Sequence, residues 1–91
     1  LYTDIYLAKK ITDYTRQDKE KGRDTYLTID YIRELIKNGG NKCCSVFETG
    51  DECEADVNTE NFTLDRLNNA FGHIQGNVRI CCLACNRKKV V

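Results

Sequence analysis

Large apolar side chains are scarce in this sequence. Tryptophan and methionine are absent from its 91 residues, phenylalanine occurs three times, and apolar residues make up 41%. A chain of this length lies near the lower limit of what one hydrophobic core stabilises by itself. We therefore expect a single folded unit with an additional staple, and the six cysteines are the candidates for it.

Long apolar runs are missing as well. No segment approaches the about 18 apolar residues that a membrane-spanning helix requires, so no membrane contact is predicted. The sequence also lacks the apolar stretch of a secretory signal peptide, which favours an intracellular protein. It begins at Leu1 rather than at methionine, and whether it is part of a longer chain or a larger assembly is left open.

An excess of charge of one sign is also absent, because 14 Lys and Arg residues balance 14 Asp and Glu residues. The net charge therefore gives no argument for a polyanionic partner. Acidic residues concentrate in residues 48–60, and basic ones in residues 9–10, 19–23 and 87–89. The first two basic runs are typical of solvated surface. The third directly follows a cysteine pair, where a basic face could bind phosphates.

Two amphipathic helices are predicted in the N-terminal part. Over residues 3–20, apolar side chains recur at near-helical spacing between charged ones. Thr28 can cap a second helix at about residues 29–37, which ends at the Asn-Gly-Gly sequence of residues 38–40. Both apolar stripes are expected to be core, and no function is assigned to them.

The pattern changes after residue 40, where strand-like segments and cysteines begin. The loop NNAFGHIQG, residues 68–76, is turn-rich. Periodicity predicts short strands at residues 42–47, 62–67 (with alternating faces) and 77–81, and a helix from residue 83 to about residue 90.

The cysteine spacing favours a metal site over disulfides. Cys82 and Cys85 form a CxxC pair, the spacing of a zinc knuckle. The other half-site is predicted to combine Cys53 with either Cys43 or Cys44. The remaining cysteines are expected to be small buried hydrophobic residues. A structural zinc implies a reducing compartment, whereas the alternative, a disulfide framework, implies secretion.

Asp65 and Asn86 suggest a second, harder metal site. Oxygen ligands from a carboxylate and an amide suit Mg²⁺, which keeps several waters and takes other ligands from substrate phosphate. Asn86 directly follows Cys85. The zinc site would therefore orient the helix that presents Asn86.

The order of these features resembles the HNH endonuclease family. The family's ββα-metal core has a strand ending in Asp, a loop, an Asn before the next strand, and a CxxC that opens a helix. Here these are Asp65, Asn77 and the sequence CCLACNRKK. The resemblance covers residues 43–89 and is most specific over LDRLNNAFGHIQGNVRICCLACNRKK. The Asp-Arg, Gly-His and Asn-Val pairs are most similar to phage and large-virus members, so a viral or phage origin is expected.

Taken together, the periodicity of the N-terminal part and the resemblance predict an α+β fold in which two N-terminal helices precede a small zinc-stabilised ββα-metal unit. Residues 1–40 would form the helical segment that packs on this unit, residues 41–91, in one compact whole. Cys82 and Cys85 would be half of the zinc site.

The resemblance also implies roles for individual residues. Asp65 and Asn86 would bind the catalytic Mg²⁺ or Mn²⁺, and Asn77 would hold the loop before the second strand. Lys88 or Lys89 would contact the DNA backbone, and the adjacent Arg87 belongs to the same predicted nucleic-acid-binding surface.

Arg66 departs from the family pattern. In the best understood members the residue after the metal-binding Asp is His, the general base that activates water. Arginine cannot act as a base near neutral pH, although Arg66 could hold the scissile phosphate. The base would then be His73, metal-bound water or the substrate itself. A structural role for His73 in the loop is the alternative.

The sequence therefore leaves two alternative functions. The first is an HNH-type nuclease that binds nucleic acid, expected to be double-stranded DNA, and hydrolyses a phosphodiester bond with a divalent metal. The second is a non-catalytic nucleic-acid-binding or structural module derived from the same fold, which Arg66 favours.

Overall fold

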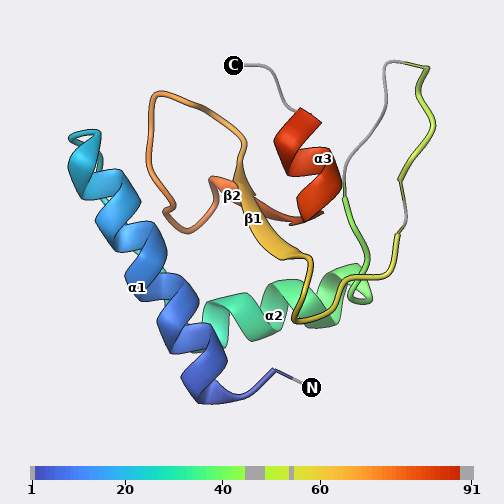
Figure 1. Cartoon of the computed structure of the whole chain (residues 1–91), viewed down its shortest axis with the longest axis horizontal. Helices are drawn as coiled ribbons and strands as arrows, with labels where there is room; N and C mark the ends of the chain where they lie inside the picture. Colours follow the sequence, from blue (N-terminus) through green and yellow to red (C-terminus); the bar gives the residue numbers. More distant parts are fainter. Residues whose placement is uncertain (1, 45–48, 54, 89–91) are drawn as a thin grey trace.

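The computed structural model describes residues 2–44, 49–53 and 55–88. Two N-terminal helices flank a central antiparallel hairpin, and a short third helix follows it directly (Figure 1). The predicted α+β class is confirmed. In chain order the elements are α1 (Asp4–Glu20), α2 (Ile29–Gly39), β1 (Phe62–Arg66), β2 (Val78–Cys82) and α3 (Leu83–Lys88).

The helix ends follow from local sequence. Thr3 caps α1 by accepting a hydrogen bond from the Tyr6 backbone N–H at 3.1 Å, and Thr28 caps α2 in the same way. α2 ends at Gly39 and is capped by Gly40, which has the left-handed conformation with a φ of 61° that glycine adopts readily. Both predicted helices are confirmed to within two residues. In the part of the chain that the structure describes, no helix is long and apolar enough to cross a membrane.

The sheet has two strands paired antiparallel, with Phe62 opposite Cys82 and Arg66 opposite Val78. The strands predicted at residues 62–67 and 77–81 are confirmed to within one residue. The predicted alternation of buried and exposed positions is wrong, because the first four residues of β1 are all buried. The reason is that other elements pack on both faces of β1. Phe62 packs against the ring of Tyr2, and α3 contacts both strands.

The third predicted strand, residues 42–47, is not confirmed. Lys42 forms only an isolated antiparallel bridge with Asp56, and the two residues after it have no regular structure. Residues 45–47 lie outside the described part of the chain, as do residues 89–90 at the end of the predicted C-terminal helix.

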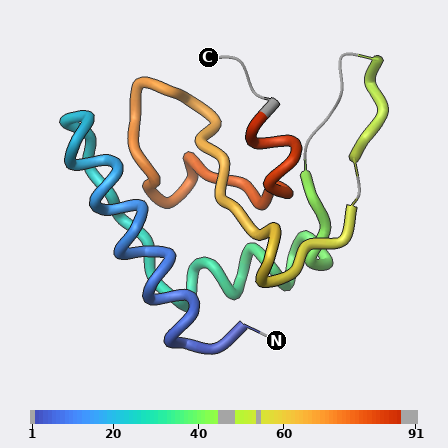
Figure 2. The backbone as a smooth tube through the Cα atoms, in the orientation of Figure 1, coloured from blue at the N-terminus to red at the C-terminus, as the bar shows by residue number. Residues whose placement is uncertain are grey.

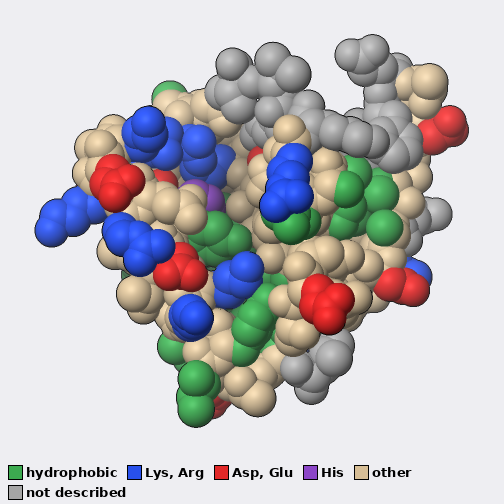
Figure 3. Space-filling model, in the orientation of Figure 1, with side chains coloured by type: hydrophobic (Ala, Val, Ile, Leu, Met, Phe, Trp, Pro, Cys, Tyr) green, Lys and Arg blue, Asp and Glu red, His purple; other side chains and the backbone are tan. Residues whose placement is uncertain are grey.

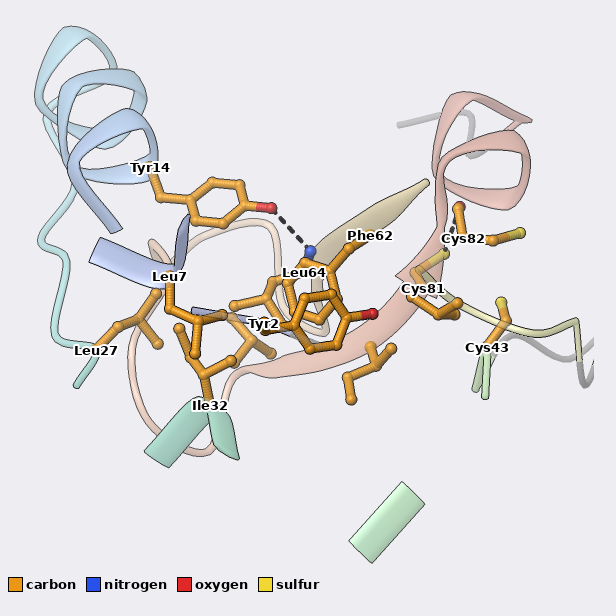
Figure 4. Packing of buried hydrophobic residues seen from close by; sticks show 13 residues of the cluster. Tyr2, Leu7, Tyr14, Leu27, Ile32, Cys43, Phe62, Leu64, Cys81 and Cys82 are labelled. Carbon is orange, nitrogen blue, oxygen red and sulfur yellow. Dashed lines mark hydrogen bonds between the residues drawn. The ribbon is translucent and has the colours of Figure 1, made fainter. Parts of the chain in front are cut away.

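One hydrophobic core is shared by the N-terminal helices and the hairpin (Figure 4). Its most deeply buried side chains include Leu7 of α1, Ile32 of α2 and Leu64 of β1. The Leu64 backbone N–H also donates a hydrogen bond of 2.9 Å to the hydroxyl of Tyr14, drawn as a dashed line in Figure 4. Helix α1 is therefore tied to β1 by packing and by a buried hydrogen bond.

The loop between β1 and β2, residues 67–77, lies against the C-terminal end of α1 and the segment after it (Figure 2). The Tyr26 backbone N–H donates to the His73 carbonyl at 2.9 Å, and Gln75 N–H donates back to the Tyr26 carbonyl at 3.0 Å. At Gly72 the approach is so close that a Cβ atom would lie 2.0 Å from the Asp24 carbonyl oxygen. Only glycine permits this contact without rearrangement.

Candidate functional site

Four cysteines form a cluster at one end of the hairpin. The sulfur atoms of Cys43, Cys53, Cys82 and Cys85 all lie within 4.8 Å of one another. Cys82 ends β2 and Cys85 lies in the first turn of α3, so the CxxC spacing places both on one side of the strand–helix junction. These four side chains could hold a metal ion.

Backbone hydrogen bonds bring the first of these cysteines to the hairpin. The Cys43 N–H donates to the Ala55 carbonyl, and the next residue, Cys44, donates to the Ile80 carbonyl of β2, both at 2.9 Å. The structure places Cys43 in the cluster, whereas Cys44 is exposed and its sulfur lies 3.7 Å from the Lys42 carbonyl oxygen. This distinguishes the two residues that the sequence left as alternatives.

Beside the hairpin lies a pocket of about 170 Å³. Three different elements contribute side chains that could take part in catalysis or metal binding: Asp65 from β1, His73 from the loop and Asn86 from α3. Tyr14 and Gln17 of α1 complete the wall on the N-terminal side. The pocket therefore brings together the predicted metal ligands and the predicted base.

Asp65 is buried and forms an ion pair across the sheet. Its Oδ2 atom accepts a hydrogen bond of 3.1 Å from Nε of Arg79, the residue directly opposite it on β2. Asn86 is half-buried on α3. A carboxylate and an amide that line one pocket offer oxygen ligands of the kind that Mg²⁺ and Mn²⁺ bind.

Arg66 lines the same pocket but also holds the loop. Its Nη1 atom donates to the carbonyl oxygens of Asn69 at 2.9 Å and of Phe71 at 3.0 Å. Asn77 holds the loop from the other side, because its amide donates to the carbonyls of Asn68 and Gly72 and its Oδ1 accepts from Asn68 N–H. Asn77 is buried in these contacts, as a loop-holding residue should be.

His73 is not an exposed loop residue. Its ring is buried and stacks on the ring of Tyr14, with 4.2 Å between the ring centroids. Its Nδ1 atom lies 3.0 Å from Oδ2 and 3.1 Å from Oδ1 of Asp18, and its backbone N–H donates to Oδ2 at 2.8 Å. The histidine is therefore clamped between two side chains of α1.

Sequence reasoning missed Asp18. This aspartate is fully buried, with an exposed fraction of 0%, and lies 55 positions before His73. A signal was present in the sequence: Asp18 continues the buried stripe of α1 formed by Leu7 and Tyr14, where a charged residue needs a polar contact.

The charge states of this pair follow from its contacts. Burial would raise the pKa of Asp18, but the hydrogen bonds from His73 and Thr25 together hold that pKa below its usual value. Burial lowers the pKa of His73 more than the neighbouring Asp18 carboxylate raises it. Near neutral pH the pair is therefore an ionised carboxylate beside a neutral imidazole.

The predicted nucleic-acid-binding residues lie at the C-terminal end of the chain. Arg87 is exposed on α3, and Lys88 is the last residue of that helix. Lys89 lies outside the described residues. A second group of cations lies over α1 and the neighbouring part of the same face, where Lys and Arg side chains alternate with a few acidic ones (Figure 3).

Comparison of the chain with protein-family models, with curated proteins and with solved structures gave no match. The pocket and the cysteine cluster are therefore the features from which a function is inferred.

Proposed function

We propose that this chain is an HNH-type nuclease domain that binds double-stranded nucleic acid and hydrolyses a phosphodiester bond with a divalent metal. One observation carries the proposal. Asp65, His73 and Asn86 come from three separate segments and line a single pocket. A carboxylate, an amide and an imidazole in one concave site are the groups that metal-assisted hydrolysis needs.

The cysteine cluster supports a structural zinc ion. A tetrahedron with Zn–S bonds of about 2.3 Å places its sulfur atoms about 3.8 Å apart, and the four sulfur atoms already lie within 4.8 Å of one another. Four thiolates suit zinc better than magnesium, which prefers oxygen. Zinc would join residue 43 to the start of α3 and so fix the helix that carries Asn86.

The pocket also suits a hard divalent cation. Asp65 and Asn86 would hold Mg²⁺ or Mn²⁺, and a volume of about 170 Å³ leaves room for a phosphate group and several waters. When bound, such a cation neutralises the charge that develops on the phosphate. Arg66 and Arg23 also line the pocket, and their guanidinium groups favour an anionic substrate there.

A specific observation favours the second candidate, a non-catalytic nucleic-acid-binding module. Arg66 occupies the position of the family's usual base and donates two hydrogen bonds to loop carbonyls. In this alternative Arg66 is a structural residue, and the pocket binds phosphate without cleaving it.

The deciding experiment is cleavage of supercoiled plasmid by the purified, zinc-loaded chain with Mg²⁺, with Mn²⁺ and with EDTA. We expect cleavage that depends on the added metal. Asp65→Asn keeps the shape of the side chain and an oxygen for Arg79, and should reduce cleavage by about 10²-fold or more because a charged metal ligand is lost. Its zinc content should not change, since the cysteine cluster is separate.

The matched control is Glu34→Gln, the same carboxylate-to-amide change on the exposed face of α2. It should cleave like the parent chain. A parent chain that binds DNA and retains zinc, yet never cuts with either metal, would replace the nuclease proposal with the non-catalytic module.

A further inference from the structure

The most buried charged side chain of the described residues belongs to α1, outside the segment that resembles a nuclease. Asp18 is 0% exposed. Its carboxylate accepts hydrogen bonds from the Thr25 hydroxyl at 2.7 Å and the His73 backbone N–H at 2.8 Å. It also contacts the Nδ1 atom of His73 at 3.0 Å and forms an ion pair with Nε of Arg23 at 3.5 Å. Helix α1 thus places a buried carboxylate against the histidine of the pocket.

The carboxylate determines which ring nitrogen of His73 carries the proton. An ionised carboxylate only accepts hydrogen bonds, so the Nδ1 atom facing Asp18 must be the N–H donor of the neutral ring. The other nitrogen, Nε2, then has the lone pair. His73 lines the pocket, whereas Asp18 does not. Because Nδ1 is held by Asp18, Nε2 is the ring nitrogen that is left to act toward the pocket in this inference.

The orientation of the ring is restricted from three directions. Tyr14 covers one ring face at a centroid distance of 4.2 Å, and Asp18 contacts Nδ1. The carbonyl oxygen of His73 accepts a hydrogen bond from the Tyr26 backbone N–H. The charged groups near the ring are Asp18 on α1, Arg23 in the segment after it and Arg66 on β1. Both arginines disfavour a cationic imidazole, so they favour the neutral form, which can accept a proton.

We propose that Asp18 is a positioning residue that orients His73 so that its Nε2 atom accepts the proton of the hydrolytic water. This inference rests on the proposed nuclease function. It also makes α1 a part of the catalytic site. Arg66 leaves the position of the family's usual base without a proton acceptor, and the Asp18–His73 pair supplies one from a different segment.

The proposed step is a simple hydrolysis. Water transfers one proton to Nε2 of His73 while its oxygen forms a bond to phosphorus. The bond between phosphorus and the leaving oxygen breaks, and that oxygen takes up a proton from solvent. His73 then releases its proton to solvent, so that one diester and one water become one monoester and one alcohol.

Asp18 also has a structural role, because it binds Thr25 and the loop backbone. A loss of activity in a variant would therefore not be sufficient evidence. The tautomer of His73 can be measured independently of stability. Because His73 is the sole histidine of the chain, its ring nitrogens give unambiguous NMR signals in protein labelled with ¹⁵N-histidine.

In the unaltered, zinc-loaded chain we expect the Nδ1–H tautomer above pH 7. In Asp18→Asn the amide can donate as well as accept, so the Nε2–H tautomer should appear. The control is Thr25→Val, which removes another hydrogen bond to Asp18 and leaves the contact with His73 in place. It should retain the parent tautomer. An Nε2–H tautomer in the unaltered chain would overturn the inference, and this measurement needs neither a variant nor nuclease activity.

Plasmid cleavage under saturating DNA gives the second readout. His73→Gln should lose on the order of 10² to 10⁴-fold in kcat. Asp18→Asn should also lose kcat with little change in KM, and the double variant should be no slower than His73→Gln, because Asp18 acts through His73. Thr25→Val should cleave at close to the parent rate.

The outcomes separate the two proposals. A parent chain that cleaves, with His73→Gln or Asp18→Asn equally active, would remove this inference and leave the nuclease function standing. Additive losses in the double variant would also remove it. A parent chain that never cleaves would overturn both.

Discussion

At the scale of single residues, burial gives Asp18 and His73 properties that their residue types alone do not have. The aspartate keeps its charge inside the fold because three hydrogen-bond donors face it. The histidine keeps a neutral ring because it is buried under Tyr14 and near two arginines. The Asp18 carboxylate alone would favour a protonated ring, and burial together with the two arginines outweighs it.

The shifted pKa values of Asp18 and His73 predict that the free energy of unfolding depends on pH. The pKa of His73 is lowered in the folded chain, so the unfolded chain binds more protons once the pH falls below the unfolded value of about 6.5. Above that pH the histidine is neutral in both states and costs no stability. As the pH falls from about 6.5 to the folded pKa of His73, the free energy of unfolding decreases. Asp18 adds a similar loss at lower pH, below about 4.

Urea denaturation of the parent chain and of His73→Gln between pH 7.5 and pH 5.5 tests this. The parent should lose more stability over this range than the variant. Because both carry the same cysteines, any loss of metal in acid affects them equally and cancels in the comparison. Equal losses would show that His73 is already able to take up a proton in the folded chain.

At the scale of elements, the loop of residues 67–77 joins β1 to β2 and packs against the C-terminal end of α1 and the segment after it. It can lie so close because Gly72 has no side chain, and a Cβ atom there would also lie 2.7 Å from Oδ2 of Asp18. The position of His73 in the pocket therefore depends on the absence of a side chain at Gly72, the residue before it. Arg66 and Asn77 hold the same loop through its carbonyl groups.

Gly72→Ala should consequently push the loop away from α1. We expect a loss of about 1–3 kcal/mol in the free energy of unfolding, typical of overpacking, and a changed NMR signal of His73. The control is Gly39→Ala at the end of α2, where the nearest atom to an added Cβ is the Cys44 sulfur at 3.9 Å. It should change stability by less than about 1 kcal/mol. Equal effects of the two substitutions would contradict the close contact at residue 72.

At the scale of the whole molecule, four clustered cysteines that could hold a metal ion lie beside a small core. They join the segment after α2, the loop at residue 53 and the junction of β2 with α3. These segments share few large apolar side chains, so a metal ion would contribute much of the stability of this end, on the order of 10 kcal/mol for a structural zinc.

Two adjacent cysteines provide a matched test of that site. Cys43→Ser should lower the zinc content from one ion per chain to less, because its sulfur belongs to the cluster. Cys44→Ser should retain the ion, because its side chain is exposed and outside the cluster. Elemental analysis and thermal unfolding with and without a chelator would measure both. Loss of zinc in Cys44→Ser and not in Cys43→Ser would reverse the assignment.

The sequence by itself determined the local features of this protein. Helices α1 and α2, their threonine caps, both strands of the hairpin and the CxxC junction were all predictable, because each depends on hydrogen bonds and apolar spacing within a few residues. The scarcity of large apolar residues likewise indicated a need for a staple.

Only the tertiary structure decided which side chains meet. The choice of Cys43 over Cys44 depends on backbone pairing with β2, and the contact between Asp18 and His73 spans 55 positions. Neither follows from sequence periodicity, because a long-range contact depends on how the whole chain closes and packs. For the same reason the burial of both faces of β1 was missed: its covering elements, α3 and the N-terminal tyrosines, lie elsewhere in the sequence.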